Sequence, residues 1–262
     1  MNNGKYPNIE IQYNHLLGEI LALANELNIH NSLELSIYFS YLLWNGYLSK
    51  SKKHLYQFSN RKNIDGLMFA DIIDGRGVCY NQADFLTRFL NFCGYDSTLL
   101  FNLNDQNTKL DYKLNIKKRR KVENNDDKIF LGDLMIKIFG NHVFTLIEDK
   151  DKIYIFDVTR LCLLRIKNSF TAEIINGNGL YKLKPYLSYL LNNNHKLLSK
   201  LLKNDCYDIP YSNDEFRLIG ERIINLLENN LLLIEDFYLE IKPDLLNISQ
   251  ATDQIMELKR KK

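Results

Sequence analysis

The stretch that decides the fold reads GRGVCYNQADFLTRFLNFCGYD and spans residues 75 to 96. It opens with a glycine-rich turn, and from Val78 to Cys93 apolar residues recur at the spacing of one helix face. Gly94 then stands where glycine commonly ends a helix. The pattern predicts a helix over residues 78 to 93, with a cysteine at its start, directly after the turn.

Strand patterns follow this helix. Three segments are short and rich in β-branched and aromatic residues: 97 to 103 (STLLFNL), 142 to 148 (HVFTLIE) and 153 to 159 (IYIFDVT). Residues 161 to 166 are a further strand candidate. The polar tetrad between 148 and 153 is a hairpin signature. If its turn centres on Asp149 to Asp151, residues whose numbers add up to about 300 face each other.

Helical spacing dominates both flanks. It predicts helices over residues 9 to 28 and 33 to 48, the second capped by Asn31 or Ser32, and a polar, basic loop over 49 to 63. From Leu180 onward the chain is leucine-rich and helical in period, with breaks at Pro210 and Pro243, and Asn213 is the expected N-cap of a helix over 215 to 227.

The order of helices, then helix and strands, then helices predicts an α+β fold. We expect a catalytic core with N-terminal helices over residues 1 to 170, and a C-terminal helical extension packed on that core over residues 171 to 262.

Charge gives no global attraction to nucleic acid or to an anionic membrane, because 34 basic residues stand against 32 acidic ones. A basic run at 117 to 121 is followed at once by an acidic run, which predicts a solvated, mobile loop over 104 to 128. Polar residues interrupt every apolar run, and the first residues lack the apolar core of a signal peptide. We therefore expect neither a nucleic-acid partner nor a membrane one.

The 4 cysteines show no C-x-x-C pair, so neither a zinc site nor a disulfide framework is expected. We expect a reduced, cytoplasmic protein without a cofactor. Cys93, Cys162 and Cys206 are interpreted as core residues, which leaves Cys79 as the cysteine with a chemical role.

Cys79, His142 and Asp157 form a candidate catalytic triad. A helix N-terminus favours the thiolate of Cys79, and its free N–H groups can stabilise an oxyanion. His142 begins one strand of the expected hairpin and Asp157 lies near the end of the next, so the two side chains can lie on one face. The carboxylate can then orient the imidazole toward the thiol.

Three motifs, taken together, resemble the transglutaminase-like core of the papain-related cysteine enzymes: G-x-G-V-C before an amphipathic helix ending in Gly-Tyr, N-H-V-x-x-x-I, and Y-x-F-D-V-T. The resemblance covers roughly residues 70 to 165. It implies a papain-like fold in which a nucleophile helix packs on an antiparallel sheet. It also implies Cys79 as nucleophile, His142 as general base and acid, and Asp157 as orienting carboxylate.

The function implied is acyl transfer through a thioester on Cys79. Hydrolysis of a peptide or isopeptide bond is the first expectation, with a peptide or protein amide as substrate, and transfer to an amine follows closely. One alternative is an arylamine N-acetyltransferase, whose Arg-Gly-Gly-x-Cys turn Arg76-Gly77-Val78-Cys79 matches except at the second glycine. Another is a non-catalytic module that keeps the fold and has lost the reaction.

Several neighbours depart from the family's pattern or receive other interpretations. Papain-type proteases have a glutamine shortly before the cysteine that acts as an oxyanion donor, but residues 70 to 78 contain no glutamine. The N–H of Cys79 is therefore the expected donor. Trp44, the only tryptophan, is expected in the core, Asn81 and Gln82 in surface or capping roles, and His54 in a polar context. Asp71 and Asp74 are candidates to line the cleft.

Overall fold

The computed structural model describes residues 7–57, 69–103, 143–150, 152–159, 161–168, 171–176, 179–183, 186–187 and 211–260. The chain divides into two compact units, which are described separately. One comprises residues 1–95 and 218–262, and the other residues 96–217. We call them the helical unit and the sheet unit. The expected division of the chain at residue 170 stays a prediction.

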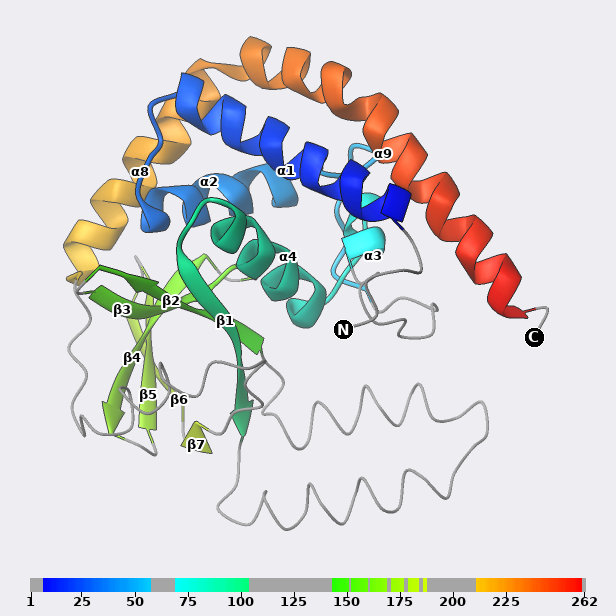
Figure 1. Cartoon of the computed structure of the whole chain (residues 1–262). Coiled ribbons are helices and arrows are strands. Elements are labelled where there is room, and N and C mark those ends of the chain that lie inside the picture. Colours follow the sequence, from blue (N-terminus) through cyan, green and yellow to red (C-terminus); the bar gives the residue numbers. More distant parts are fainter. Residues whose placement is uncertain are drawn as a thin grey trace, which may run out of the picture. The chain divides into compact units, whose positions relative to one another are not determined.

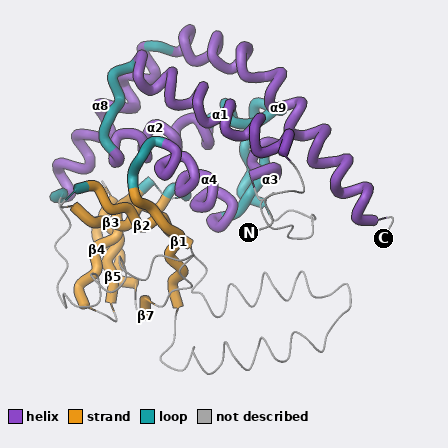
Figure 2. Tube along the Cα trace, viewed as in Figure 1, coloured by secondary structure: helices purple, strands orange, loops and turns teal. Residues whose placement is uncertain are grey.

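The helical unit contains α1 (Pro7–Glu26), α2 (Ser32–Trp44), α3 (Phe69–Ile73), α4 (Cys79–Phe92) and α9 (Leu231–Arg260) (Figure 1). The boundary between the units falls inside α8 (Asn213–Asn229), between Arg217 and Leu218. The predicted helices over 9–28, 33–48 and 78–93 are confirmed, with ends that differ by a few residues. Helices in the flanks and strands between them make the fold α+β (Figure 2).

Capping residues at the start of α2 and the end of α4 explain why these boundaries could be predicted from the sequence. The side chain of Asn31 accepts the N–H of Glu34 at 2.9 Å, as expected of an N-cap. Gly94 has φ +88°, and the N–H of Tyr95 reaches back to the carbonyl of Leu90 at 3.0 Å. That positive φ and that backward bond define a Schellman motif, so Gly94 ends α4 as predicted.

Aromatic side chains form the centre of the helical unit. The Phe39 ring of α2 meets Phe85 edge-on at 5.1 Å and stacks on Phe89 at 5.4 Å, both on α4. The Tyr13 ring of α1 stacks on Phe69 of α3 at 4.0 Å. These contacts bury the apolar face of α4 and hold its N-terminal end at a fixed place in the unit.

The C-terminal helices differ in two details from expectation. Ser212 accepts the N–H of Glu215 through its hydroxyl and donates its own N–H to the Glu215 carboxylate, so the N-cap of α8 is Ser212 and the prediction of Asn213 was wrong. A break at Pro243 was also wrong, because α9 continues through it. α9 packs along α1, and this tertiary contact offsets the lost backbone hydrogen bond.

The sheet unit contains a seven-stranded sheet in the order β6-β5-β4-β3-β2-β1-β7. Its strands are β1 (Asp96–Leu103), β2 (Val143–Asp149), β3 (Lys152–Asp157), β4 (Cys162–Asn168), β5 (Thr171–Asn176), β6 (Gly179–Leu183) and β7 (Tyr186–Leu187). All neighbouring pairs are antiparallel. The strand predictions for 97–103, 142–148, 153–159 and 161–166 are confirmed for the residues described.

The predicted hairpin is β2 and β3, and its register is well defined. Asp149 pairs with Lys152 and Leu146 with Ile155, so the numbers of paired residues add up to 301 where about 300 was expected. Lys150, in the turn, has φ +57°, as two-residue hairpin turns require. Val143 to Ile147 are buried without interruption, so both faces of β2 are covered.

The expectation of helical structure from Leu180 onward was wrong for its first part. β6 and β7 lie there, and β5 comes just before them. Short apolar runs carry no decisive period, and here β6 pairs with β5 and β7 pairs with β1. Residues 104–128 and Pro210 lie outside the described residues. Among the helices that the structure describes, none has both the length and the apolar character needed to cross a membrane.

Candidate active site

Cys79 is the first residue of α4 and follows a turn that begins at Gly75. Cys79 is in no disulfide and retains 8% of its accessible surface, whereas Ala83, one helical turn further on, retains none. The thiol therefore lies at the edge of the core and at the N-terminal end of the helix, where the first N–H groups have no acceptor within the helix itself. A thiolate at this end interacts favourably with the helix dipole.

Two glycines of the turn are required by the space around them. Gly75 has φ +81°, and a Cβ there would lie 2.3 Å from the carbonyl oxygen of Lys53. A Cβ on Gly77 would lie 2.7 Å from Cδ1 of Ile72 and 3.0 Å from Cβ of Asn81. The chain that leads into Cys79 is therefore packed tightly against α3, α4 and the segment around Lys53.

Asn81 closes the start of α4. Its Oδ1 accepts the N–H of Val78 at 3.1 Å, and its Nδ2 donates to Oδ2 of Asp71 at 3.1 Å. The expected capping role of Asn81 is confirmed. Asp71 and Asn81 are both almost fully buried, so this bond joins α3 to the beginning of α4 inside the core.

The polar segment over 49–57 forms backbone hydrogen bonds with the turn before Cys79. The N–H of Leu55 donates to the Gly75 carbonyl at 2.8 Å, and the N–H of Gly77 donates to the Leu55 carbonyl at 3.1 Å. Leu55 and Arg76 thus form an isolated parallel bridge. The residues described in this segment form a loop, as predicted, but a loop whose backbone is paired with the turn before Cys79.

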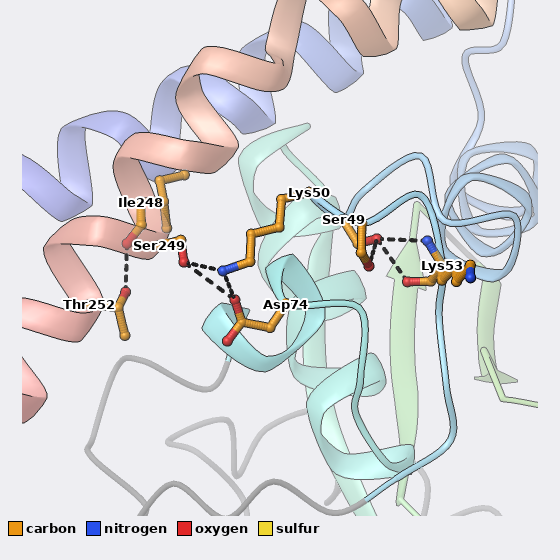
Figure 3. A network of polar contacts seen from close by, with 8 residues as sticks. Ser49, Lys50, Lys53, Asp74, Ile248, Ser249 and Thr252 are labelled. Atoms are coloured by element: carbon orange, nitrogen blue, oxygen red, sulfur yellow. Dashed lines mark hydrogen bonds and ion pairs between the residues drawn. The ribbon is translucent and has the colours of Figure 1, made fainter.

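A second brace links the same turn to α9 (Figure 3). The ammonium of Lys50 lies 2.8 Å from Oδ1 of Asp74 and 2.6 Å from the hydroxyl of Ser249. Ser249 also lies 3.4 Å from the same Asp74 oxygen. This buried carboxylate holds three elements together, so Asp74, like Asp71, has a structural partner within the helical unit.

His54 and Gln82 form a contact that the sequence did not reveal. Nε2 of Gln82 lies 2.9 Å from Nε2 of His54 and 3.3 Å from the carbonyl oxygen of Gly77. Gln82 is fully buried, so the expected surface role was wrong. Burial lowers the pKa of His54 from 6.5 to about 4, which keeps the ring neutral at pH 7.

Trp44 is the other ring beside this pair. It meets His54 edge-on at 5.1 Å and retains 37% of its surface at the end of α2, so the expectation of a core tryptophan was wrong. The only sequence signal for Gln82 is its position three residues after Cys79. His54 had none, since its contact with α4 spans 28 positions of the sequence.

Asp157 ends β3 in the sheet unit and is completely buried. Its Oδ1 accepts the N–H of Thr159 at 3.0 Å, which shapes the turn that leads toward β4. In the register of the hairpin, alternate side chains of β2 and β3 share one face, and Leu146 and Ile155 are a pair on the face of Asp157. This carboxylate is therefore buried on that face, at the end of β3.

Two residues of the predicted triad belong to different units, and the third lies outside the described residues. Cys79 belongs to the helical unit and Asp157 to the sheet unit, and each is described within its own unit. His142 comes directly before β2, outside the described residues. The assembly of these three side chains stays a prediction.

Cys93 differs from Cys79 although both lie at ends of α4. It is the C-cap residue, it is half-buried, and burial raises the pKa of its thiol from 9.0 to about 12. The thiol is therefore protonated at neutral pH. The prediction that Cys93 is a core residue was wrong, because the residue is only half-buried.

Among the residues that the structure describes, no group of three or more His, Cys, Asp or Glu side chains is arranged to hold a metal ion. A comparison of the chain with family models, curated proteins and solved structures found no match in any of the three.

Proposed function

We propose that the chain is a cysteine-dependent acyl-transfer enzyme with a transglutaminase-like, papain-related core. In this proposal Cys79 is the nucleophile, His142 the general base and acid, and Asp157 the carboxylate that orients the imidazole. The substrate is a peptide or protein amide, hydrolysis is the first reaction expected, and the enzyme works in the reducing cytoplasm.

One observation carries the proposal: Cys79 is the first residue of a 14-residue helix and follows a turn braced on both sides. A structural cysteine needs no such support, whereas a nucleophile must be held within a fraction of an ångström. The position also supplies the N–H of Cys79 as an oxyanion donor and the helix dipole as a stabiliser of the thiolate.

The hairpin gives independent support. Its register places even-numbered positions of β2 on the same face as odd-numbered positions of β3, the face of Asp157. We predict that His142, which immediately precedes β2, continues this alternation. It would then lie diagonally from Asp157, within reach of a carboxylate.

The proposed reaction has two steps. The Cys79 thiolate attacks the amide carbonyl carbon, the C–N bond breaks, and the amine leaves with a proton from the His142 imidazolium, which gives a thioester. Water then gives a proton to His142 and attacks the thioester. The acid is released and the thiolate is restored. An amine in place of water gives transamidation.

The test uses an activated acyl ester, p-nitrophenyl acetate, as the probe. Peptide mass mapping should find the acetyl group on Cys79, and Cys79→Ala should remove the burst of nitrophenol. His142→Ala should nearly remove it, whereas Cys93→Ala, the matched control on the same helix, should leave it unchanged. Acetylation of Cys93 at the rate of Cys79, or a burst that survives Cys79→Ala, contradicts the proposal.

The same assay separates the alternatives. Faster loss of the acyl-enzyme on addition of a primary amine identifies transamidation. Turnover with acetyl-CoA and an arylamine identifies the arylamine N-acetyltransferase reaction. If Cys79 is never acylated, the chain is a non-catalytic module of this fold and the proposed function fails.

A further inference from the structure

The contact between His54 and Gln82 has a defined direction. An amide nitrogen only donates hydrogen bonds, and Nε2 of Gln82 faces two acceptors, the Gly77 carbonyl at 3.3 Å and Nε2 of His54 at 2.9 Å. Exchange of the two amide atoms would turn an oxygen toward the carbonyl of Gly77, and two acceptors repel. With this amide orientation Nε2 of His54 accepts, which assigns the proton of the neutral ring to Nδ1, a buried atom that has no hydrogen-bond partner among the described residues.

This chain of bonds ends at the turn that presents the nucleophile. Gly77 comes two residues before Cys79, and Gln82 lies one helical turn after it, so the Gln82 amide ties both sides of the cysteine together. His54 comes from the segment whose backbone pairs with Gly75 and Gly77 through Leu55. The side-chain bond and the backbone bonds thus act on the same turn from the same segment.

We propose that His54 and Gln82 are positioning residues: the imidazole orients the Gln82 amide, which holds the Gly77 carbonyl and thereby fixes the turn that carries Cys79. The consequence for reactivity rests on the proposed function, while the bonding pattern does not.

The surroundings of His54 favour a hydrogen bond to Gln82 that persists at neutral pH. The contacts that the structure describes for its ring are with the Trp44 ring and the Gln82 amide, neither of which titrates near neutral pH. The neutral ring keeps Nε2 available as an acceptor, because burial keeps the pKa of His54 at about 4. A protonated imidazole has no acceptor nitrogen and would lose the bond.

Two substitutions remove the bond with little change in shape. His54→Phe retains a ring beside Trp44 but has no acceptor, and Gln82→Met retains the length of the side chain but has no donor. His54→Gln, which offers an acceptor again, is the rescue variant. His30→Phe is the matched control, since His30 is exposed in the same unit.

The readout is the acetylation rate of Cys79 by p-nitrophenyl acetate. We expect His54→Phe and Gln82→Met each to slow acylation by about 10- to 100-fold, the scale of a small misplacement of a reacting group. The double variant should be no slower than either single one, because both remove the same bond. His54→Gln should recover most of the rate. Unchanged rates, additive losses or the absence of rescue would overturn the proposal.

NMR of the wild-type protein keeps the proposal falsifiable if the variants fail to fold or if Cys79 is not acylated. Long-range ¹H–¹⁵N spectra of the His54 ring should show the proton on Nδ1, and a proton on Nε2 overturns the assignment. If Cys79 is unreactive, the proposed function fails. The backbone amide chemical shifts of Gly77 and Cys79 in His54→Phe then test whether His54 positions the turn. Shifts that move support it, and unchanged shifts refute it.

Discussion

The Nδ2 atom of Asn81 donates a hydrogen bond to Oδ2 of Asp71 over 3.1 Å in the core of the helical unit. The other end of the same amide accepts the N–H of Val78, so one side chain joins α3 to α4 and satisfies a backbone donor at the helix start. The residue that precedes Cys79 is held by this link.

Asn81→Ala should lower the free energy of unfolding by about 1–3 kcal/mol, since it leaves the buried carboxylate of Asp71 and the N–H of Val78 without this partner. Asn14→Ala on the exposed side of α1 is the control and should change it by less than about 0.5 kcal/mol. Alanine improves helix propensity similarly at both sites. Equal effects of the two substitutions in urea titrations would show that the link contributes nothing.

Alanine should have opposite effects at a crowded glycine of the turn and at an uncrowded glycine of α8. Gly77→Ala should destabilise the protein, because its Cβ would meet Ile72 at 2.7 Å and Asn81 at 3.0 Å. Gly220→Ala in α8 meets nothing within 4 Å and should stabilise the helix by about 0.5–1 kcal/mol. Thermal unfolding measures both. A neutral or stabilising Gly77→Ala would mean that the turn yields easily.

Cys93 should resist alkylation up to about pH 9, because burial raises the pKa of its thiol to about 12 and the thiolate is the reactive form. Cys79 should be alkylated at neutral pH, with an apparent pKa below the ordinary value of about 8.5. Iodoacetamide labelling as a function of pH, with peptide mapping, measures both thiols. Comparable labelling of the two cysteines at pH 7 is the unfavourable result.

His54 should make the protein acid-sensitive. Its pKa in the folded state is about 4, below the ordinary 6.5. Between pH 6.5 and about 4 the unfolded chain therefore binds more protons than the folded one, and stability falls as the pH falls through this window. His54→Gln removes that contribution. Urea titrations at pH 7 and pH 4.5 should show a smaller acid loss for the variant, and an equal loss would assign the acid sensitivity to other groups.

Local signals in the sequence predicted the parts of the fold that depend on neighbours along the chain. The apolar spacing of α4, with Gly94 after it, set that helix, and the tetrad at 149–152 set the hairpin. Short apolar runs near Leu180 were ambiguous in period, and pairing with neighbouring strands decided them. Pro243 was expected to break a helix, but contacts of α9 with α1 and α3 outweigh that preference.

The sequence motifs predicted where single residues of the candidate site lie, but not the contacts between distant segments. The place of Cys79 at a helix start and of Asp157 at a strand end followed from spacing, and both are confirmed as locations. The strand pattern did not reveal that Asp157 is completely buried. The His54–Gln82 contact could not be predicted, because a bond between a loop and a helix leaves no periodic trace in sequence.

The most direct test of the triad is the acetylation rate of Cys79 by p-nitrophenyl acetate in Asp157→Asn, measured on protein shown to be folded by circular dichroism. Asparagine keeps an oxygen that can accept the N–H of Thr159, so the turn after β3 should persist. If Asp157 orients His142, the rate should fall by about 10⁴-fold, the effect of removing an orienting carboxylate from a catalytic triad. A rate within about threefold of the wild-type value would make Asp157 a structural residue and contradict the triad.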